Sequence, residues 1–170
     1  NHSKYIIANS NMVKQQIMDT YDISPHKIKV IYNGIELKNN NYEKSFKKLS
    51  QEFLINENQP VLLYVGSGFK RKGVAEFLKI VSELKTKDIK AFIIGKDKNI
   101  KYYKNLTRKL KIHNQVTFTG TRLDVNDFYS ISDIFLFPTH YDPFSNVVLE
   151  AMNFENAVFT TRSNGASEIL

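Results

Sequence analysis

From residue 60 onward, the sequence alternates short apolar runs with stretches of helical periodicity. The apolar runs occupy residues 60–66, 91–95, 116–120, 133–138 and 157–161. Between the first two, residues 73–85 place Val74, Phe77 and Leu78 at the spacing of one helix face. Continuous apolar strands separated by helices are typical of a parallel sheet. The pattern therefore predicts an α/β fold, a Rossmann-like parallel sheet with helices on both faces.

Composition narrows the class of protein. The 170 residues are 42% hydrophobic, enough for a sizeable core, and no apolar run approaches the roughly 18 residues that a membrane span requires. Because there is no Cys, disulfides and thiolate metal sites are excluded, and a reducing cytoplasm is the expected location. The net charge of +7 favours an anionic partner. Nucleic acid, acidic lipid and a phosphorylated small molecule all remain open.

The first 50 residues have a different organisation. Residues 4–10 form a β-rich run before a helix that opens near Ser10, and residues 27–34 predict a strand closed by a turn at Asn33 and Gly34. The polar segment 36–48, rich in Asn and Lys, is typical of a linker. We therefore expect residues 1–35 to end one domain and residues 36–170 to form a second, with the whole chain cut from a longer protein that continues beyond both ends.

The loops after the apolar runs are the expected ligand-binding region, because ligands of such sheets bind at the carboxyl ends of the strands. Gly66 ends the first run, and glycine there permits close backbone approach or simply turns the chain. A basic cluster follows at Lys70, Arg71 and Lys72, just before a helix. Such cations could neutralise a diphosphate, although a solvated charge run is the commoner explanation of a cluster seen alone.

Residues 140–150 place two carboxylates around a helix start. Ser145 is a suitable N-cap, so the backbone amides of residues 145–148 predict an anion site. Asp142 precedes that site and Glu150 lies within the helix. A carboxylate can accept two hydroxyl protons, which suits a sugar or the ribose diol. Alternatively, Asp142 closes a turn and Glu150 covers an exposed helix face.

Several stretches carry a family resemblance in one order along the chain. They are YVGSGFKRKGV, IIGKDK, VTFTGTRLDVNDFYSISDIFLFP, YDPFSNVVLEAM and NGASEI. Together they resemble the C-terminal half of the retaining group 1 glycosyltransferases of GT-B fold, closest to the lipopolysaccharide core glucosyltransferase I subgroup. ANSNMVKQQI and KIKVIYNGIE are similar to the end of that family's N-terminal domain and its inter-domain crossing.

The resemblance implies a role for each matching position. Asp142 would lie by the transferred sugar as the catalytic residue, and Glu150 would bind the ribose diol. Arg71 and Lys72 would bind the donor diphosphate. The remaining donor contacts would come from Gly66, from the backbone amides of Phe144, Ser145, Asn146 and Val147, and from Thr121 and Arg122 beside the base. The family's first acid is usually Glu, so Asp142 is shorter by one methylene, about 1.5 Å of reach, which bears on the choice of sugar.

The implied reaction is transfer of a hexose with retention, with UDP-glucose as the expected donor and no metal ion or other cofactor. The expected acceptor is a glycan or glycolipid such as a lipopolysaccharide or lipooligosaccharide core, read by the N-terminal domain. Peripheral association with an anionic membrane would fit the surplus of Lys. Two alternatives stay open, a nucleotide-sugar epimerase of GT-B fold and a basic nucleic-acid-binding module. Because most aromatic residues lie in apolar strand and helix segments, where core packing is expected, we expect no nucleic-acid partner.

Overall fold

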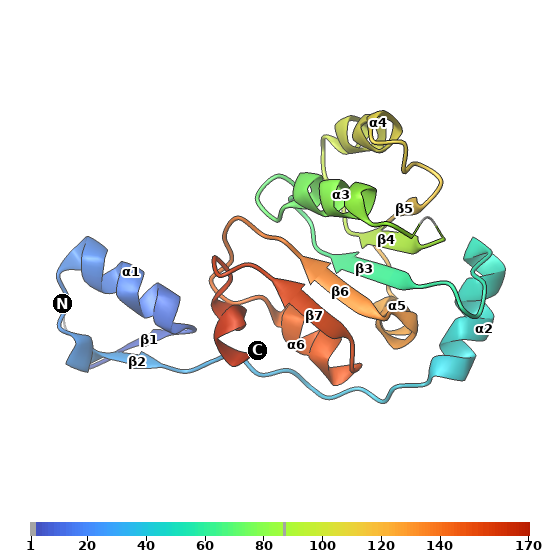
Figure 1. Ribbon diagram of the computed structural model, residues 1–170. Helices are drawn as coiled ribbons and strands as arrows, with labels where there is room; N and C mark the ends of the chain where they lie inside the picture. Colours follow the sequence, from blue (N-terminus) through green and yellow to red (C-terminus); the bar gives the residue numbers. More distant parts are fainter. Residues whose placement is uncertain (1–2, 87) are drawn as a thin grey trace.

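The apolar runs form one parallel sheet in the computed structural model, which describes residues 3–86 and 88–170 (Figure 1). The strand order is β5-β4-β3-β6-β7. The strands are β3 (Val61–Val65), β4 (Lys90–Ile94), β5 (Val116–Gly120), β6 (Ile134–Phe137) and β7 (Ala157–Thr160). The α/β fold predicted from the alternation is confirmed.

Helices cover both faces of this sheet. The helices are α3 (Val74–Glu83), α4 (Ile100–Lys109), α5 (Val125–Ile131) and α6 (Asn146–Asn153). The chain winds outward through α3 and α4 from β3 to β5, then returns through α5 and α6 to the other edge. Because such crossovers are right-handed, the first pair lies on one face and the second pair on the other (Figure 1). Strand β3 is apolar throughout because it is covered on both faces.

Residues before β3 form a smaller unit and a connection. Strands β1 (Ile6–Ala8) and β2 (Ile28–Val30) pair in parallel, with α1 (Asn11–Tyr21) and a short 3-10 helix (Pro25–Lys27) between them. Ser10 caps α1 as expected, accepting a hydrogen bond from the amide of Val13. Residues 31–41 have no regular secondary structure and lead to the main sheet (Figure 1).

Two expectations for this region are wrong. The predicted turn at Asn33 and Gly34 does not form, and the chain runs on without a turn. The predicted linker 36–48 is helical from residue 42, because α2 (Tyr42–Phe53) begins there. The side chain of Asn41 caps that helix, and Phe46, Leu49 and Phe53 share the face that packs on the core. The predicted domain boundary between residues 35 and 36 falls inside the connection and stays a prediction.

A short 3-10 helix, η2 (Gly165–Ile169), follows β7. Across residues 3–86 and 88–170, no helix combines the length and apolar character needed to cross a membrane.

Candidate functional site

The strand order reverses direction between the neighbouring strands β3 and β6, so the chain leaves them toward opposite edges of the sheet. One loop runs from Gly66 to Gly73 and the other from Pro138 to Ser145. Such a switch point at the carboxyl ends of the strands is where open α/β sheets bind ligands. The two segments singled out from the sequence therefore meet at one place.

Glycines bring the two loops together. Gly73 has a φ of 76°, and a Cβ there would lie 1.8 Å from the carbonyl oxygen of Pro138. A Cβ on Gly66 would lie 3.1 Å from Cδ of Lys72, so the stem of Lys72 runs along this glycine. The expected role of Gly66 in the close approach of a ligand stays a prediction. Gly73, which matters more for the loop contact, was not singled out from the sequence.

A cation-carboxylate cluster lies between the loops. Asp142 Oδ2 is 3.4 Å from Nζ of Lys72 and 3.6 Å from Nη1 of Arg71. The Arg71 guanidinium also donates a 2.6 Å hydrogen bond to the carbonyl of Tyr141. Asp142 is only 7% exposed, so its charge is held largely inside the protein and paired. Both cations remain accessible enough to meet a ligand, since their side chains are 19% (Lys72) and 52% (Arg71) exposed.

The segment after β7 fixes the backbone of this cluster. The amide of Asp142 donates to the carbonyl of Ser163, and the amide of Gly165 donates to the carbonyl of Asp142. Asn164, fully buried, accepts hydrogen bonds at Oδ1 from the amides of Ser145 and Ala166. Asn164 is thus a site residue that sequence reasoning missed, although it opens the NGASEI motif.

The start of α6 offers fewer free amides than expected. The amide of Ser145 is bonded to Asn164, and the amide of Val148 is bonded to the carbonyl of Ser145. Among the described hydrogen bonds, the amides of Asn146 and Val147 have no acceptor. Ser145 occupies the N-cap position, but its hydroxyl makes no capping bond and is buried without a described partner. A buried hydroxyl beside two open amides is suited to an anionic or hydroxylated ligand.

Phe144 and Glu150 are each held by an aromatic residue. The ring of Phe144 packs against Tyr32 with centroids 5.6 Å apart. Glu150 Oε2 accepts a 2.9 Å hydrogen bond from the hydroxyl of Tyr129. Burial, and then the Glu150 charge, raises the pKa of Tyr129 well above its ordinary value, so the phenol stays a donor at neutral pH. This bond fixes one carboxylate oxygen and leaves Oε1 without a described partner.

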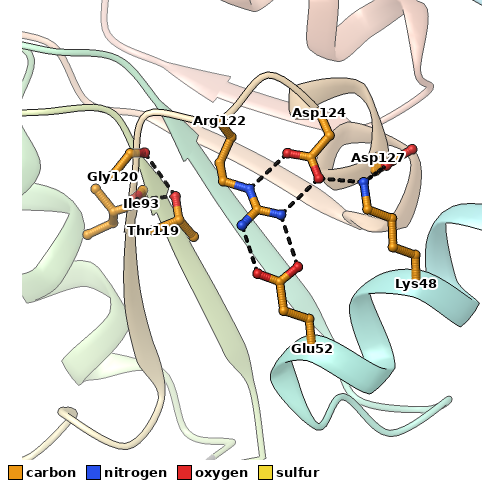
Figure 2. Close-up of polar contacts among 8 residues, drawn as sticks. All are labelled: Lys48, Glu52, Ile93, Thr119, Gly120, Arg122, Asp124 and Asp127. Carbon is orange, nitrogen blue, oxygen red and sulfur yellow. Dashed lines mark hydrogen bonds and ion pairs between the residues drawn. The ribbon is translucent and has the colours of Figure 1, made fainter.

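Arg122 is committed to a separate ion-pair network (Figure 2). Its guanidinium makes bonds of 2.7 and 2.9 Å to Glu52 on α2 and bonds of 2.8 Å to Asp124. Lys48 links Asp124 to Asp127 in the same network (Figure 2). The hydrogen bonds from Arg122 hold the pKa of Asp124 well below its usual range. Arg122 therefore braces α2 against the start of α5, and none of its described contacts reaches Asp142.

A cavity of about 310 Å³ opens at the carboxyl ends of β4 and β5. Its lining is part aromatic and part charged and comprises Gly95, Lys96, Asp97, Ile100, Lys104, Phe118 and Gly120. Thr121 follows Gly120 directly and is exposed. Within the described part of the chain, no three His, Cys, Asp or Glu side chains come together as metal ligands.

Two family models match the sequence. Residues 45–170 match the model described as glycosyl transferases group 1, and residues 1–39 match the model of glycosyltransferase family 4.

Curated relatives agree with these matches. The chain is 34% identical over 63% of its length to lipopolysaccharide glucosyltransferase WaaG of Escherichia coli, covering 29% of that protein. It is 31% identical over 95% of its length to the capsular polysaccharide glycosyltransferase CapM of Staphylococcus aureus, covering 44% of it. The chain therefore spans less than half the length of these relatives.

Solved structures confirm the architecture. A glycosyltransferase from Rickettsia africae superposes on 98% of the chain with a TM-score of 0.89 at 26% identity, and the chain covers 46% of it. The structure of WaaG superposes on 96% of the chain with a TM-score of 0.83 at 26% identity, and the chain covers 45% of it. The expected GT-B architecture is thus confirmed, whereas the expected subgroup stays a prediction. Because its family model matches most of the sequence, the chain belongs to the group 1 glycosyltransferases.

Proposed function

We infer that this chain is the donor-binding part of a metal-independent, retaining hexosyltransferase. The observation that carries the proposal is the cluster at the switch point, where Arg71 and Lys72 share Asp142 beside the open amides of Asn146 and Val147. Two fixed cations and two amides suit a diphosphate, and the adjacent carboxylate suits sugar hydroxyls.

Each part of a nucleotide sugar has a matching group along this edge of the sheet. The nucleoside base would enter the cavity that ends at Gly120, and Oε1 of Glu150 would accept from the ribose. The diphosphate would lie between Lys72 and the start of α6. Asp142 would orient the sugar. Thr121 would lie near the base. Arg122 would hold the loop in position through its hydrogen bonds to Asp124.

The proposed roles of these residues follow from the charges that develop in the transition state. Breaking the bond between the sugar and the diphosphate leaves positive charge on the sugar and negative charge on the leaving group. Arg71, Lys72 and the α6 amides would stabilise the leaving diphosphate, which elsewhere is the work of a divalent cation. Asp142, whose Oδ2 lies 3.4 Å from Nζ of Lys72, would stabilise the positive charge that develops on the sugar.

UDP-glucose is the proposed donor, and a cell-surface glycan or lipopolysaccharide core is the proposed acceptor. WaaG is named a lipopolysaccharide glucosyltransferase and CapM a capsular polysaccharide glycosyltransferase. The HepE protein of Anabaena, which shares the fold at 22% identity and a TM-score of 0.87, is described in complex with UDP and glucose. These names support the choice of donor and acceptor class, and a location at the cytoplasmic side of the cell envelope would suit both.

Calorimetric titration of the chain with UDP, UDP-glucose and GDP-mannose tests the proposal. With EDTA present, we expect saturable binding of the uridine nucleotides and weaker binding of GDP-mannose. Adding Mg²⁺ should change the UDP dissociation constant by less than about threefold, because fixed cations already neutralise the diphosphate. Binding that appears only with Mg²⁺ would contradict metal independence. Tighter binding of GDP-mannose than of UDP-glucose would contradict UDP-glucose as the donor.

The two alternatives make different predictions. An epimerase would convert UDP-glucose without an acceptor, which chromatography of the nucleotide sugar would reveal. Membership of a glycosyltransferase family favours transfer over both epimerisation and nucleic-acid binding.

A further inference from the structure

One segment of the chain carries many positive charges and no negative charge. Residues 98–123 contain seven of the 24 Lys and Arg residues and none of the 17 Asp and Glu residues. The rest of the chain holds 17 residues of each sign, with a net charge of +6 in residues 1–97 and −6 in residues 124–170. One of the seven cations, Arg122, is neutralised by Glu52 and Asp124. The other six have no described ion pair.

These six cations form a basic face along α4 and its ends. The face consists of Lys98, Lys101, Lys104, Arg108, Lys109 and Lys111, all of them exposed. The opposite side of α4 is buried, through Tyr103 and Thr107. Lys101, Lys104 and Arg108 follow helical spacing, so they stand in one row. Figure 1 shows α4 beyond α3 at the outside of the fold, far from β7.

The basic face also has a hollow of headgroup size. A cavity of about 330 Å³ lies between α4 and β5, and Lys104, Arg108 and His113 are among its lining residues. Tyr102 is 59% exposed at the start of α4. A Tyr ring beside Lys side chains is suited to the boundary between water and a lipid headgroup layer.

We propose that the basic face of α4 docks the protein on an anionic lipid surface. Six exposed cations on α4 and at its two ends form the kind of charge cluster that attracts anionic headgroups. Lys outnumbers Arg five to one among these cations, which suits diffuse attraction to headgroups more than bidentate recognition. Because the apolar side of α4 is packed on the protein, the contact is electrostatic and does not insert the helix. The proposal is independent of the donor assignment.

Vesicle co-sedimentation tests this surface with a charge-matched control. The face variant neutralises Lys101, Arg108, Lys109 and Lys111 to Gln, leaving Lys104 intact because it also lines the nucleoside cavity. The control variant neutralises Lys27, Lys29, Lys44 and Lys47, which are exposed on other elements. Both variants carry a net charge of +3.

The wild-type chain should bind vesicles of phosphatidylglycerol mixed with phosphatidylcholine and should not bind phosphatidylcholine alone. The face variant should bind at least about a hundredfold more weakly, and the control variant less than about threefold more weakly. Binding should also be lost in about 0.5 M NaCl. Thermal unfolding and UDP titration of each variant check that the fold and the donor site are unchanged.

Three results would overturn the proposal. The first is an equal loss of binding in both variants, since that would mean that net charge alone acts. The second is binding to vesicles without anionic lipid, or no binding of the wild-type chain. The third is displacement from the vesicles by polyuridylate at equal phosphate concentration, with the face variant losing polyuridylate binding, which would assign the face to nucleic acid.

Discussion

At the scale of single residues, Asp142 holds the most informative position. It is nearly buried and shares one oxygen, Oδ2, between Lys72 and Arg71. A diphosphate arriving there would meet two cations that are already partly neutralised. Asp142 therefore has two opposing effects, because it orients the cations and competes with the phosphates for them.

Replacing Asp142 with Asn should separate these effects. The Asp142→Asn variant keeps the side-chain shape but removes the competing charge, so UDP should bind a few-fold more tightly. The same variant should lose any preference for UDP-glucose over UDP, because the amide is a weaker acceptor for sugar hydroxyls. Calorimetry with both ligands measures this. A tenfold loss of UDP affinity would mean that Asp142 acts mainly as a scaffold for the cations.

At this scale, the sequence predicted which residues belong to the site better than it predicted their interaction partners. It placed Arg71, Lys72 and Asp142 in one site, and the structure brings their side chains together. It could not foresee that Glu52, from a segment expected to adjoin a linker, would engage Arg122. It likewise missed Asn164, because a buried Asn in a polar motif is indistinguishable from a loop residue until its partners are known.

At the scale of elements, the loop from Gly66 to Gly73 contains two glycines with the same positive φ. Gly68 and Gly73 both have a φ of 76°. A Cβ on Gly68 would meet no atom within 4 Å, whereas a Cβ on Gly73 would strike the carbonyl of Pro138. Gly73 also differs from Gly68 in being the N-cap of α3.

This pair predicts two different losses of stability. Gly68→Ala should lower the free energy of unfolding by about 1–2 kcal/mol, the cost of a left-handed conformation for Ala. Gly73→Ala should lower it by at least about 2 kcal/mol more, because a backbone carbonyl has to move. Urea unfolding of the two variants measures the difference. Equal losses would mean that the loop contact with Pro138 contributes nothing.

The elements themselves were predictable wherever apolar periodicity was strong. All five strands of the main sheet match the predicted apolar runs to within one residue at their starts, because buried parallel strands need continuous apolar sequence. Helix α2 was missed because the segment 36–48, which overlaps its first half, is rich in Asn and Lys, although Phe46, Leu49 and Phe53 already marked the buried face of the helix. In that segment, periodicity was the correct guide and composition was misleading.

At the scale of the whole molecule, Glu168 joins the small N-terminal unit to the part of the chain that contains the main sheet. Its carboxylate accepts hydrogen bonds of 2.8 Å from the amides of Asn11 and Met12 and of 2.9 Å from the hydroxyl of Tyr32. These two amides are the first of α1 and would otherwise lack acceptors. The helix is therefore capped by a residue from the far end of the chain, one that follows Asn164 in the same motif.

Glu168→Gln should loosen this junction. Hydrogen exchange at the amides of Asn11 and Met12 should become about 3- to 10-fold faster, because charged acceptors bind amides more strongly. Glu43→Gln is the matched control, since Glu43 lies in the first turn of α2 without a described partner. Unchanged exchange in Glu168→Gln would show that the contact does not hold α1.

The same junction should respond to acid. Burial alone would raise the pKa of Glu168, but the hydrogen bonds from Asn11, Met12 and Tyr32 outweigh it and lower the pKa below its ordinary value of 4.5. A depressed folded-state pKa means that the stabilisation is present above pH 4.5 and is lost as pH falls through the folded-state value. In Glu168→Gln, this acid-dependent part of the free energy of unfolding should be absent.

The central claim is that Arg71 and Lys72 at the switch point bind the donor diphosphate, and calorimetry on one matched pair of variants tests it most directly. Lys72→Met keeps the stem beside Gly66 but removes the charge, while Lys79→Met removes an exposed charge from the middle of α3. With EDTA present, we expect Lys72→Met to bind UDP about 10- to 100-fold more weakly than the wild-type chain, and Lys79→Met to bind it equally well. Folded Lys72→Met that binds UDP as tightly as the wild-type chain would contradict the account.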